Sequence, residues 1–415
     1  MISIKNNLFS SGVLVLIGNL ITAALTFLAT SLLAKNLGVT EFGLVTFSIT
    51  FSAVLAQVID FGMDINLVKT QEDKREKTFI HSLFIKISAF CIVLIILLVV
   101  SPFLYKLNFW PNGFSELWWI VLLGALFISL NNLQLASLQS DKKFKNYVLN
   151  KFLVSFFRCF FVFMFFLFLY KEIDIKFLFY LYFFIPYFTT LYFISRRLNL
   201  TFNISGIKNQ AKFGLYIMVS NVASSLLINA DILMVQYFLG ADSVAQYGVA
   251  NLIIAPISLI ISSMMTVLLP NSQEIKTFEE MKEYVWKVLR ITIPIALIIF
   301  GILFFAVKFL ITIIYGEDYL DAISITRILL FGFCFSILTN PIYIIAYALN
   351  NSSIMMIGDL IKLALNILLN IYMIPSIGTE GAAYATTITR VIGGIITIVI
   401  ISRYVKKGRK NGKIQ

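Results

Sequence analysis

Five ionisable residues interrupt long apolar stretches of this 415-residue chain. They are Arg158, Asp231, Asp359, Lys362 and Arg390. A charged side chain at the centre of a bilayer costs about 3 kcal/mol or more, so such residues are candidates for function. Arginine and lysine suit an anion, and the planar arginine fork donates two hydrogen bonds to a phosphate. We therefore predict anion binding by the three basic residues and coupling to a cation by Asp231 and Asp359.

Neutral polar residues form a second pattern. Asn19, Thr22 and Thr26 recur at a spacing of three to four, which places them on one stripe of an apolar helix. Asn221 and Ser224 occupy a similar stripe 202 residues later. We predict that Asn19, Asn221 and Ser224 line a cavity and bind hydroxyl groups. Hydrogen bonding between neighbouring membrane helices is the alternative interpretation.

The elements that carry these residues are predicted to be membrane-spanning helices. Hydrophobic residues make up 59% of the chain and charged residues 13%, which is about half the charged fraction of a soluble domain. Unbroken apolar runs such as Ile92–Val100 favour helices over the alternating segments of a membrane barrel. Twelve spans are predicted: 11–34, 40–63, 82–106, 115–139, 149–170, 175–195, 213–239, 244–270, 288–314, 322–349, 353–374 and 381–404. One histidine and three cysteines within apolar runs predict no metal site, no disulfide and no cofactor.

The net charge of +12 is explained by topology and not by nucleic acid. With the N-terminus in the cytoplasm, the inner segments carry 21 of the 33 lysines and arginines, and the outer loops carry four. This asymmetry follows the excess of basic residues in cytoplasmic loops of membrane proteins. Both termini are therefore predicted to be cytoplasmic.

A weak internal repeat divides the chain into halves. Asn19 to Gly38 and Asn221 to Gly240 span the same number of residues at an offset of 202. We predict a lobe of six helices over 1–200, a second over 201–404 and a basic cytoplasmic tail over 405–415. Because each half holds an even number of spans, the lobes would be related by an axis along the membrane normal, as in several transporters. The chain has no phosphate-binding loop for ATP and no pore motif, so alternating access is the expected mechanism.

Several loop motifs resemble those of a known family. Leu33–Gly38 followed by Glu41–Gly43 is similar to the first-loop pattern of the polysaccharide transporter family. Tyr315–Tyr319 and Ile374–Ala383 resemble two of its outer-loop motifs, and Asn366–Asn370 resembles its asparagine-bearing helix. These are the O-antigen-type flippases of the multidrug/oligosaccharidyl-lipid/polysaccharide exporter superfamily. The resemblance implies an all-α integral membrane protein with a MATE-like fold of two six-helix lobes.

The resemblance also implies a function and a location. Such proteins move polyprenyl-pyrophosphate-linked oligosaccharides across the bacterial inner membrane and are not enzymes. The partners would then be this lipid-linked substrate, the bilayer and the polysaccharide polymerase and chain-length machinery. We expect Arg158 and Arg390, together with Lys362, to face the seam between the lobes and hold the pyrophosphate.

Two alternatives remain open at this point. A multidrug exporter of the same superfamily would bind organic cations and would need a net acidic cavity, whereas the charges near the midplane are mostly basic. An integral-membrane polysaccharide polymerase or glycosyltransferase belongs to a different class. It would need a sizeable outer loop with catalytic groups, and the outer loops predicted here are short.

Overall fold

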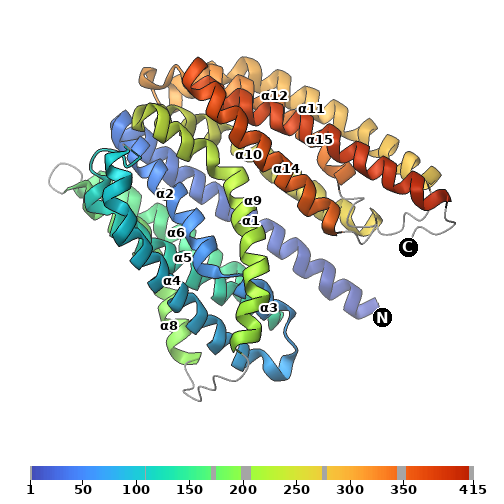
Figure 1. Cartoon of the computed structure of the whole chain (residues 1–415), viewed down its shortest axis with the longest axis horizontal. Coiled ribbons are helices and arrows are strands. Elements are labelled where there is room, and N and C mark those ends of the chain that lie inside the picture. Colours follow the sequence, from blue (N-terminus) through green and yellow to red (C-terminus); the bar gives the residue numbers. More distant parts are fainter. Residues whose placement is uncertain are drawn as a thin grey trace. The chain divides into compact units, whose positions relative to one another are not determined.

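In the residues that it describes, the computed structural model is built almost entirely of helices (Figure 1). The structure describes residues 2–107, 109–169, 174–197, 207–272, 278–343 and 352–410. Within these ranges there is no strand, and eleven helices are long and apolar enough to cross a membrane. The protein is therefore an all-α membrane protein.

The chain folds into two compact units, and the division falls inside a helix. Unit 1 comprises Met1–Ser225 and unit 2 comprises Leu226–Gln415, so helix α9 (Ile207–Leu239) belongs to both. The other elements of unit 1 are α1 (Ile2–Asn36), α2 (Val39–Asp60), α3 (Met63–Lys69), η1 (Glu72–Lys74), α4 (Arg75–Lys106), α5 (Phe114–Ser140), α6 (Phe144–Met164), the π turn η2 (Phe165–Leu169), α7 (Ile175–Phe183), η3 (Ile185–Tyr187) and α8 (Phe188–Arg197).

Unit 2 completes α9 and adds the helices of the second half of the chain. They are α10 (Ala241–Ser272), α11 (Phe278–Ile314), η4 (Glu317–Tyr319), α12 (Ala322–Tyr343), α14 (Ser352–Ile377) and α15 (Thr379–Lys410). In Figure 1 these helices run from yellow-green to red.

Most predicted spans coincide with the observed helices. Eleven of them fall on candidate membrane helices, and the twelfth, 381–404, lies on α15. The sixth is broken into α7, η3 and α8 because Pro186 lacks the amide hydrogen that a continuous helix needs. The predicted lobe boundary at 200 and the last residues of the predicted tail, 411–415, lie outside the described residues.

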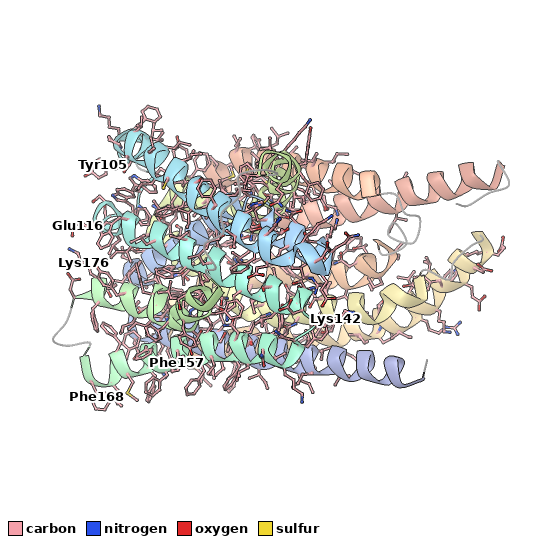
Figure 2. The ribbon with its side chains drawn as sticks, turned by 90° about the horizontal axis from the view of Figure 1, so that it is seen from below. Tyr105, Glu116, Lys142, Phe157, Phe168 and Lys176 are labelled. Carbon is pink, nitrogen blue, oxygen red and sulfur yellow. The ribbon has the colours of Figure 1, made fainter. Side chains whose placement is uncertain are left out.

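Helix ends in unit 1 gather at two opposite ends of the unit. Figure 2 shows Tyr105, Glu116 and Lys176 at one end of this unit and Lys142 at the other. The Lys176 ammonium forms an ion pair with the Glu116 carboxylate, which joins the first turns of α5 and α7. The apolar core of the unit lies between these ends, where Ile59, Leu97 and other side chains of α2, α4 and α5 are buried together.

Two glycines bring the turn between α2 and α3 against the first part of α9. Gly62 has a φ of +72°, a left-handed conformation that glycine adopts without steric cost. A Cβ at Gly62 would lie 2.6 Å from the backbone oxygen of Gly214, and a Cβ at Gly214 would lie 2.4 Å from that of Phe61. Both positions therefore require glycine, and the contact places the first half of α9 within unit 1.

Candidate functional site

The Asp231 carboxylate on α9 accepts hydrogen bonds from side chains of three other helices of unit 2. Its side chain is buried, and one oxygen accepts hydrogen bonds from the amides of Asn370 at 2.7 Å and Asn366 at 3.2 Å. The other oxygen accepts from the Tyr247 hydroxyl at 2.7 Å and from the Thr386 hydroxyl. We call these five residues the Asp231 cage.

Four helices bring the cage together. Asn366 and Asn370 lie one turn apart on the same face of α14, Thr386 comes from α15 and Tyr247 from α10. The turn between α14 and α15 holds these two helices close together. A Cβ at Gly381 would lie 2.2 Å from the backbone oxygen of Met373, so the backbones could not approach as they do with a larger residue.

The cage offers a cation a set of oxygen ligands. Among the residues that the structure describes, no lysine or arginine forms an ion pair with Asp231. The buried Oδ1 atom of Asn370 accepts no hydrogen bond. Rotation of the two asparagine amides would present their oxygens beside the carboxylate and the Thr386 hydroxyl, and hard cations prefer such oxygen ligands.

Two basic residues lie one helical turn from the cage, and we call them the basic pair. Arg390 follows Thr386 by four residues on α15, and Lys362 precedes Asn366 by four residues on α14. Four residues correspond to a rise of about 6 Å along a helix. The basic pair therefore forms a layer beside the cage.

Arg390 is held in a way that leaves much of its hydrogen-bonding capacity available. Its guanidinium carbon lies 3.6 Å from the centre of the Phe333 ring, and one NH group approaches the Ser336 hydroxyl at 3.4 Å. Its Nε atom is buried and donates no hydrogen bond. Among the described residues it forms no ion pair. A guanidinium in this state can accommodate an anion with several acceptor oxygens.

Lys362 is positioned by a carboxylate and a glycine. Its ammonium lies 3.3 Å from the Asp359 carboxylate, so the predicted pairing of these two residues on one helix face is present. A Cβ at Gly393 would lie 2.6 Å from Lys362 Cγ, so the glycine makes room for the lysine stem on α15.

Both layers line the cavities of unit 2. A cavity of about 620 Å³ is lined by Asp231, Tyr247, Thr386 and Arg390, with Asn251, Ser258 and Asn340 among its polar walls. A second cavity of about 230 Å³ is lined by Asp359, Lys362, Asn366 and Arg390. Because Arg390 and Thr386 line both, the four ionisable residues predicted from the sequence of this half surround two adjacent cavities.

Arg158 lies in unit 1, within an aromatic group. It donates a 2.6 Å hydrogen bond to the Tyr187 hydroxyl, and its guanidinium stands over the Tyr182 ring at 4.6 Å. Its Nε atom donates no hydrogen bond. The tyrosines belong to η3 and α7, so the broken sixth span positions them. The prediction that Arg158 and Arg390 face one seam remains a prediction.

The predicted polar stripes fall in different settings. The Asn19 side chain on α1 accepts a 2.6 Å hydrogen bond from the Lys151 ammonium on α6. Asn221 is partly exposed and Ser224 is exposed, and both lie on the part of α9 that belongs to unit 1. Their role as cavity-lining residues remains a prediction.

One buried charged group lies outside the candidates predicted from the sequence. Lys86 lies near the end of its span, where a lysine is expected to extend to the membrane surface. Its side chain is instead fully buried and forms ion pairs with Asp60 at 2.7 Å and Asp64 at 2.8 Å. It also donates to the backbone oxygen of Ser129 at 2.8 Å. The spacing of Asp60 and Asp64, four residues apart at a helix end, could have indicated a shared basic partner.

Asp64 lies on α3, outside the spanning helices, and its titration is strongly perturbed. Burial raises its pKa to about 8, and the adjacent Asp60 carboxylate adds to the rise, whereas the Lys86 ammonium opposes it. Two buried carboxylates share one lysine, so this group favours retention of one proton.

The partners of Asp231 were also missed. The sequence singled out Asp231 itself but not Tyr247 or Thr386, because nothing local links them to a residue on another helix. Two asparagines one turn apart in an apolar helix were the available signal for Asn366 and Asn370.

Comparison with known proteins agrees with this architecture. The chain matches the family described as "Polysaccharide biosynthesis protein" over residues 32–324. It is 29% identical over 187 residues to a Shigella flexneri protein described as an O-antigen transporter, which covers 44% of each chain. It is 27% identical over 211 residues to an uncharacterized membrane protein of Methanocaldococcus jannaschii, covering 50% of this chain and 42% of the relative. These matches thus span less than half the length of either relative.

Two solved structures show the same fold. The lipid II flippase MurJ, in an inward closed conformation, superposes with a TM-score of 0.73 at 18% identity, over 94% of this chain and 87% of that chain. An inward-facing MATE-family multidrug transporter superposes with a TM-score of 0.74 at 15% identity, over 94% and 96%. A family match across most of the chain and a shared transporter fold lead to one conclusion: this protein belongs to the polysaccharide biosynthesis protein family and has the fold of the MATE and MurJ transporters.

Proposed function

We propose that this protein is a flippase for a polyprenyl-pyrophosphate-linked oligosaccharide, such as an O-antigen repeat unit. It would move this substrate from the cytoplasmic to the outer leaflet of the bacterial inner membrane by alternating access, with both termini in the cytoplasm. The observation that carries the proposal is the placement of Arg390 and Lys362 around two adjacent polar cavities in unit 2. Family membership supports the proposal that the phosphate bound at this site belongs to a lipid-linked sugar.

The basic pair supplies what a pyrophosphate needs in a low-dielectric site. Arg390 has a planar fork with a free Nε–H, and Lys362 adds a point charge. The hydroxyl and amide groups of Ser258 and Asn340 line the same cavities and can bind sugar hydroxyls. In unit 1, Arg158 would bind the phosphate, and Asn19, Asn221 and Ser224 would bind the glycan.

The Asp231 cage is proposed to hold the coupling cation. A single carboxylate surrounded by neutral side-chain oxygens fits a monovalent cation, which it would bind without a net charge left in the membrane. Asp359, which pairs with Lys362, would assist from the layer beside it. The cation is cargo of the transport cycle and not a resident cofactor.

The balance of charge favours this proposal over export of organic cations. The ionisable residues that line the two cavities are two acids, Asp231 and Asp359, and two bases, Lys362 and Arg390. A cationic drug would meet two buried positive charges and no net negative charge. A cation in the Asp231 cage would instead leave the basic pair to attract an anion.

The test is transport by purified protein in proteoliposomes that contain a fluorescent polyprenyl-pyrophosphate-linked sugar. We expect Arg390→Ala to reduce translocation at least tenfold and Arg390→Lys to restore only part of it, since lysine lacks the fork. Arg327→Ala is the matched control, because Arg327 packs on Phe304 of α11 and lines neither cavity. Equal translocation by wild type and Arg390→Ala would refute the proposal that Arg390 binds the phosphate.

Coupling is tested separately in the same vesicles by imposing proton or sodium gradients. Asp231→Asn keeps a side chain of the same shape but removes the charge. We expect its residual transport to be independent of the imposed gradients. Transport by this variant with the gradient dependence of wild type would exclude Asp231 as the coupling residue.

A further inference from the structure

The basic pair and the Asp231 cage are neighbours, and their ligands carry opposite charge. We infer that the two ligands bind cooperatively: a monovalent cation in the cage strengthens the binding of a pyrophosphate to Arg390 and Lys362, and the pyrophosphate strengthens the binding of the cation. This inference rests on the proposed function, because it takes the two ligands from it.

The Asp231 cage and the basic pair lie close enough for the charges of their ligands to interact. Two of the four helices that supply the cage, α14 and α15, also supply one member each of the basic pair, one turn away. On α15 the residues are Thr386 and Arg390, and on α14 they are Asn366 and Lys362. The helical backbone fixes the positions of these residues. The Cα atoms of each pair, which are four residues apart, are therefore separated by about 6 Å along the helix axis in any side-chain conformation.

The charges determine the sign of the effect. Without a cation, the Asp231 carboxylate repels an incoming phosphate and attracts the guanidinium of Arg390, which lines the same cavity. A cation in the cage cancels the carboxylate charge. The anion then meets two basic residues, and Asp359 is the remaining acid of the site.

The size of the effect follows from the distance. Unit charges about 6 to 8 Å apart, in a medium with an effective dielectric constant of about 20, change each other's binding by roughly tenfold or more. Allosteric couplings of this size are common, and they are reciprocal by thermodynamic necessity. The state that carries substrate is therefore expected to carry the cation as well.

The experiment measures the dissociation constant of geranyl pyrophosphate for the purified full-length protein in detergent. Sodium is exchanged for N-methylglucamine at constant ionic strength and constant pH. We expect the wild-type dissociation constant to be at least tenfold lower in sodium. Asp231→Asn should bind geranyl pyrophosphate equally in both solutions, with a dissociation constant close to that of wild type in sodium.

A control carboxylate separates a local effect from a general one. Asp318→Asn changes an acidic residue of the η4 turn that lines neither cavity, and it should keep the sodium dependence of wild type. A wild-type dissociation constant that is equal in both solutions, or sodium dependence that persists in Asp231→Asn, would overturn the inference. The proposed function fails differently: geranyl pyrophosphate would not bind to wild type, or would bind equally to Arg390→Ala.

Discussion

Lys86→Met is expected to destabilise unit 1 severely, although it replaces a charged residue of a membrane helix with an apolar one. The wild-type ammonium is fully buried and lies within 3 Å of Asp60, Asp64 and the backbone oxygen of Ser129. Its removal leaves the buried Asp60 carboxylate without a counter-charge, beside the carboxyl group of Asp64. Loss of one partner from a buried ion pair typically costs about 3 to 5 kcal/mol.

That energy converts into a measurable shift of the unfolding temperature. For a unit of this size, each kcal/mol lowers the midpoint by about 2 to 4 °C, so a fall of roughly 10 °C is expected. The assay is thermal unfolding of the detergent-solubilised protein, followed by the loss of the monodisperse peak in size-exclusion chromatography. Lys308→Met is the control, since Lys308 is exposed on α11.

A compensating variant tests whether the loss of stability in Lys86→Met is caused by the unpaired carboxyl groups. In the triple variant Asp60→Asn, Lys86→Met, Asp64→Asn no buried charge is left, so most of the lost stability should return. A midpoint within about 2 °C of wild type for Lys86→Met alone would refute the reasoning and would mean that the ammonium reaches the membrane surface.

Three further outcomes are expected. Burial raises the pKa of Asp64 from 3.8 to about 8, so the proton bound in the folded state adds stability that is greatest near pH 4 and is lost progressively up to about pH 8. The midpoint of unfolding should fall across that range for wild type and remain more nearly constant for Asp64→Asn. Gly62→Ala should lower the midpoint, because a left-handed residue with a side chain costs about 1 to 2 kcal/mol and its Cβ meets Gly214; Gly38→Ala, where the space is open, should change little. Tyr187→Phe removes the hydroxyl that receives the Arg158 hydrogen bond, and it should reduce translocation less than Arg158→Ala if the arginine contacts phosphate; equal loss in both variants would indicate a structural role.

The sequence was sufficient to predict the class of fold, because membrane-spanning helices can be recognised from the length and apolar composition of their segments. It identified Asp231, Asp359, Lys362 and Arg390 from the energetic cost of charge in hydrocarbon, and all four line two adjacent cavities of unit 2. This criterion does not depend on knowledge of the fold. It therefore works for single residues wherever they occur along the chain.

What the sequence could not supply was contact between helices distant in the chain. Thr386 and Tyr247 are ordinary polar residues of a membrane helix, and only the packing of α9, α10, α14 and α15 brings them to Asp231. The burial of Lys86 could not be predicted for the same reason, since it depends on the Asp60 and Asp64 carboxylates and not on the depth of the lysine in its span.

The contact between Gly62 and Gly214 has a consequence for how the protein can be divided. The connection between the halves lies near residue 200, but the first part of α9 packs with the helices that precede it. A chain cut at this connection would yield a first fragment with an uncovered glycine surface at the α2–α3 turn, and a second fragment whose leading helix lacks its packing partner. Separately expressed halves should consequently recognise each other through this helix, and a split reporter of assembly in living cells can be built at the connection, because the cut separates the first part of α9 from the rest of unit 1.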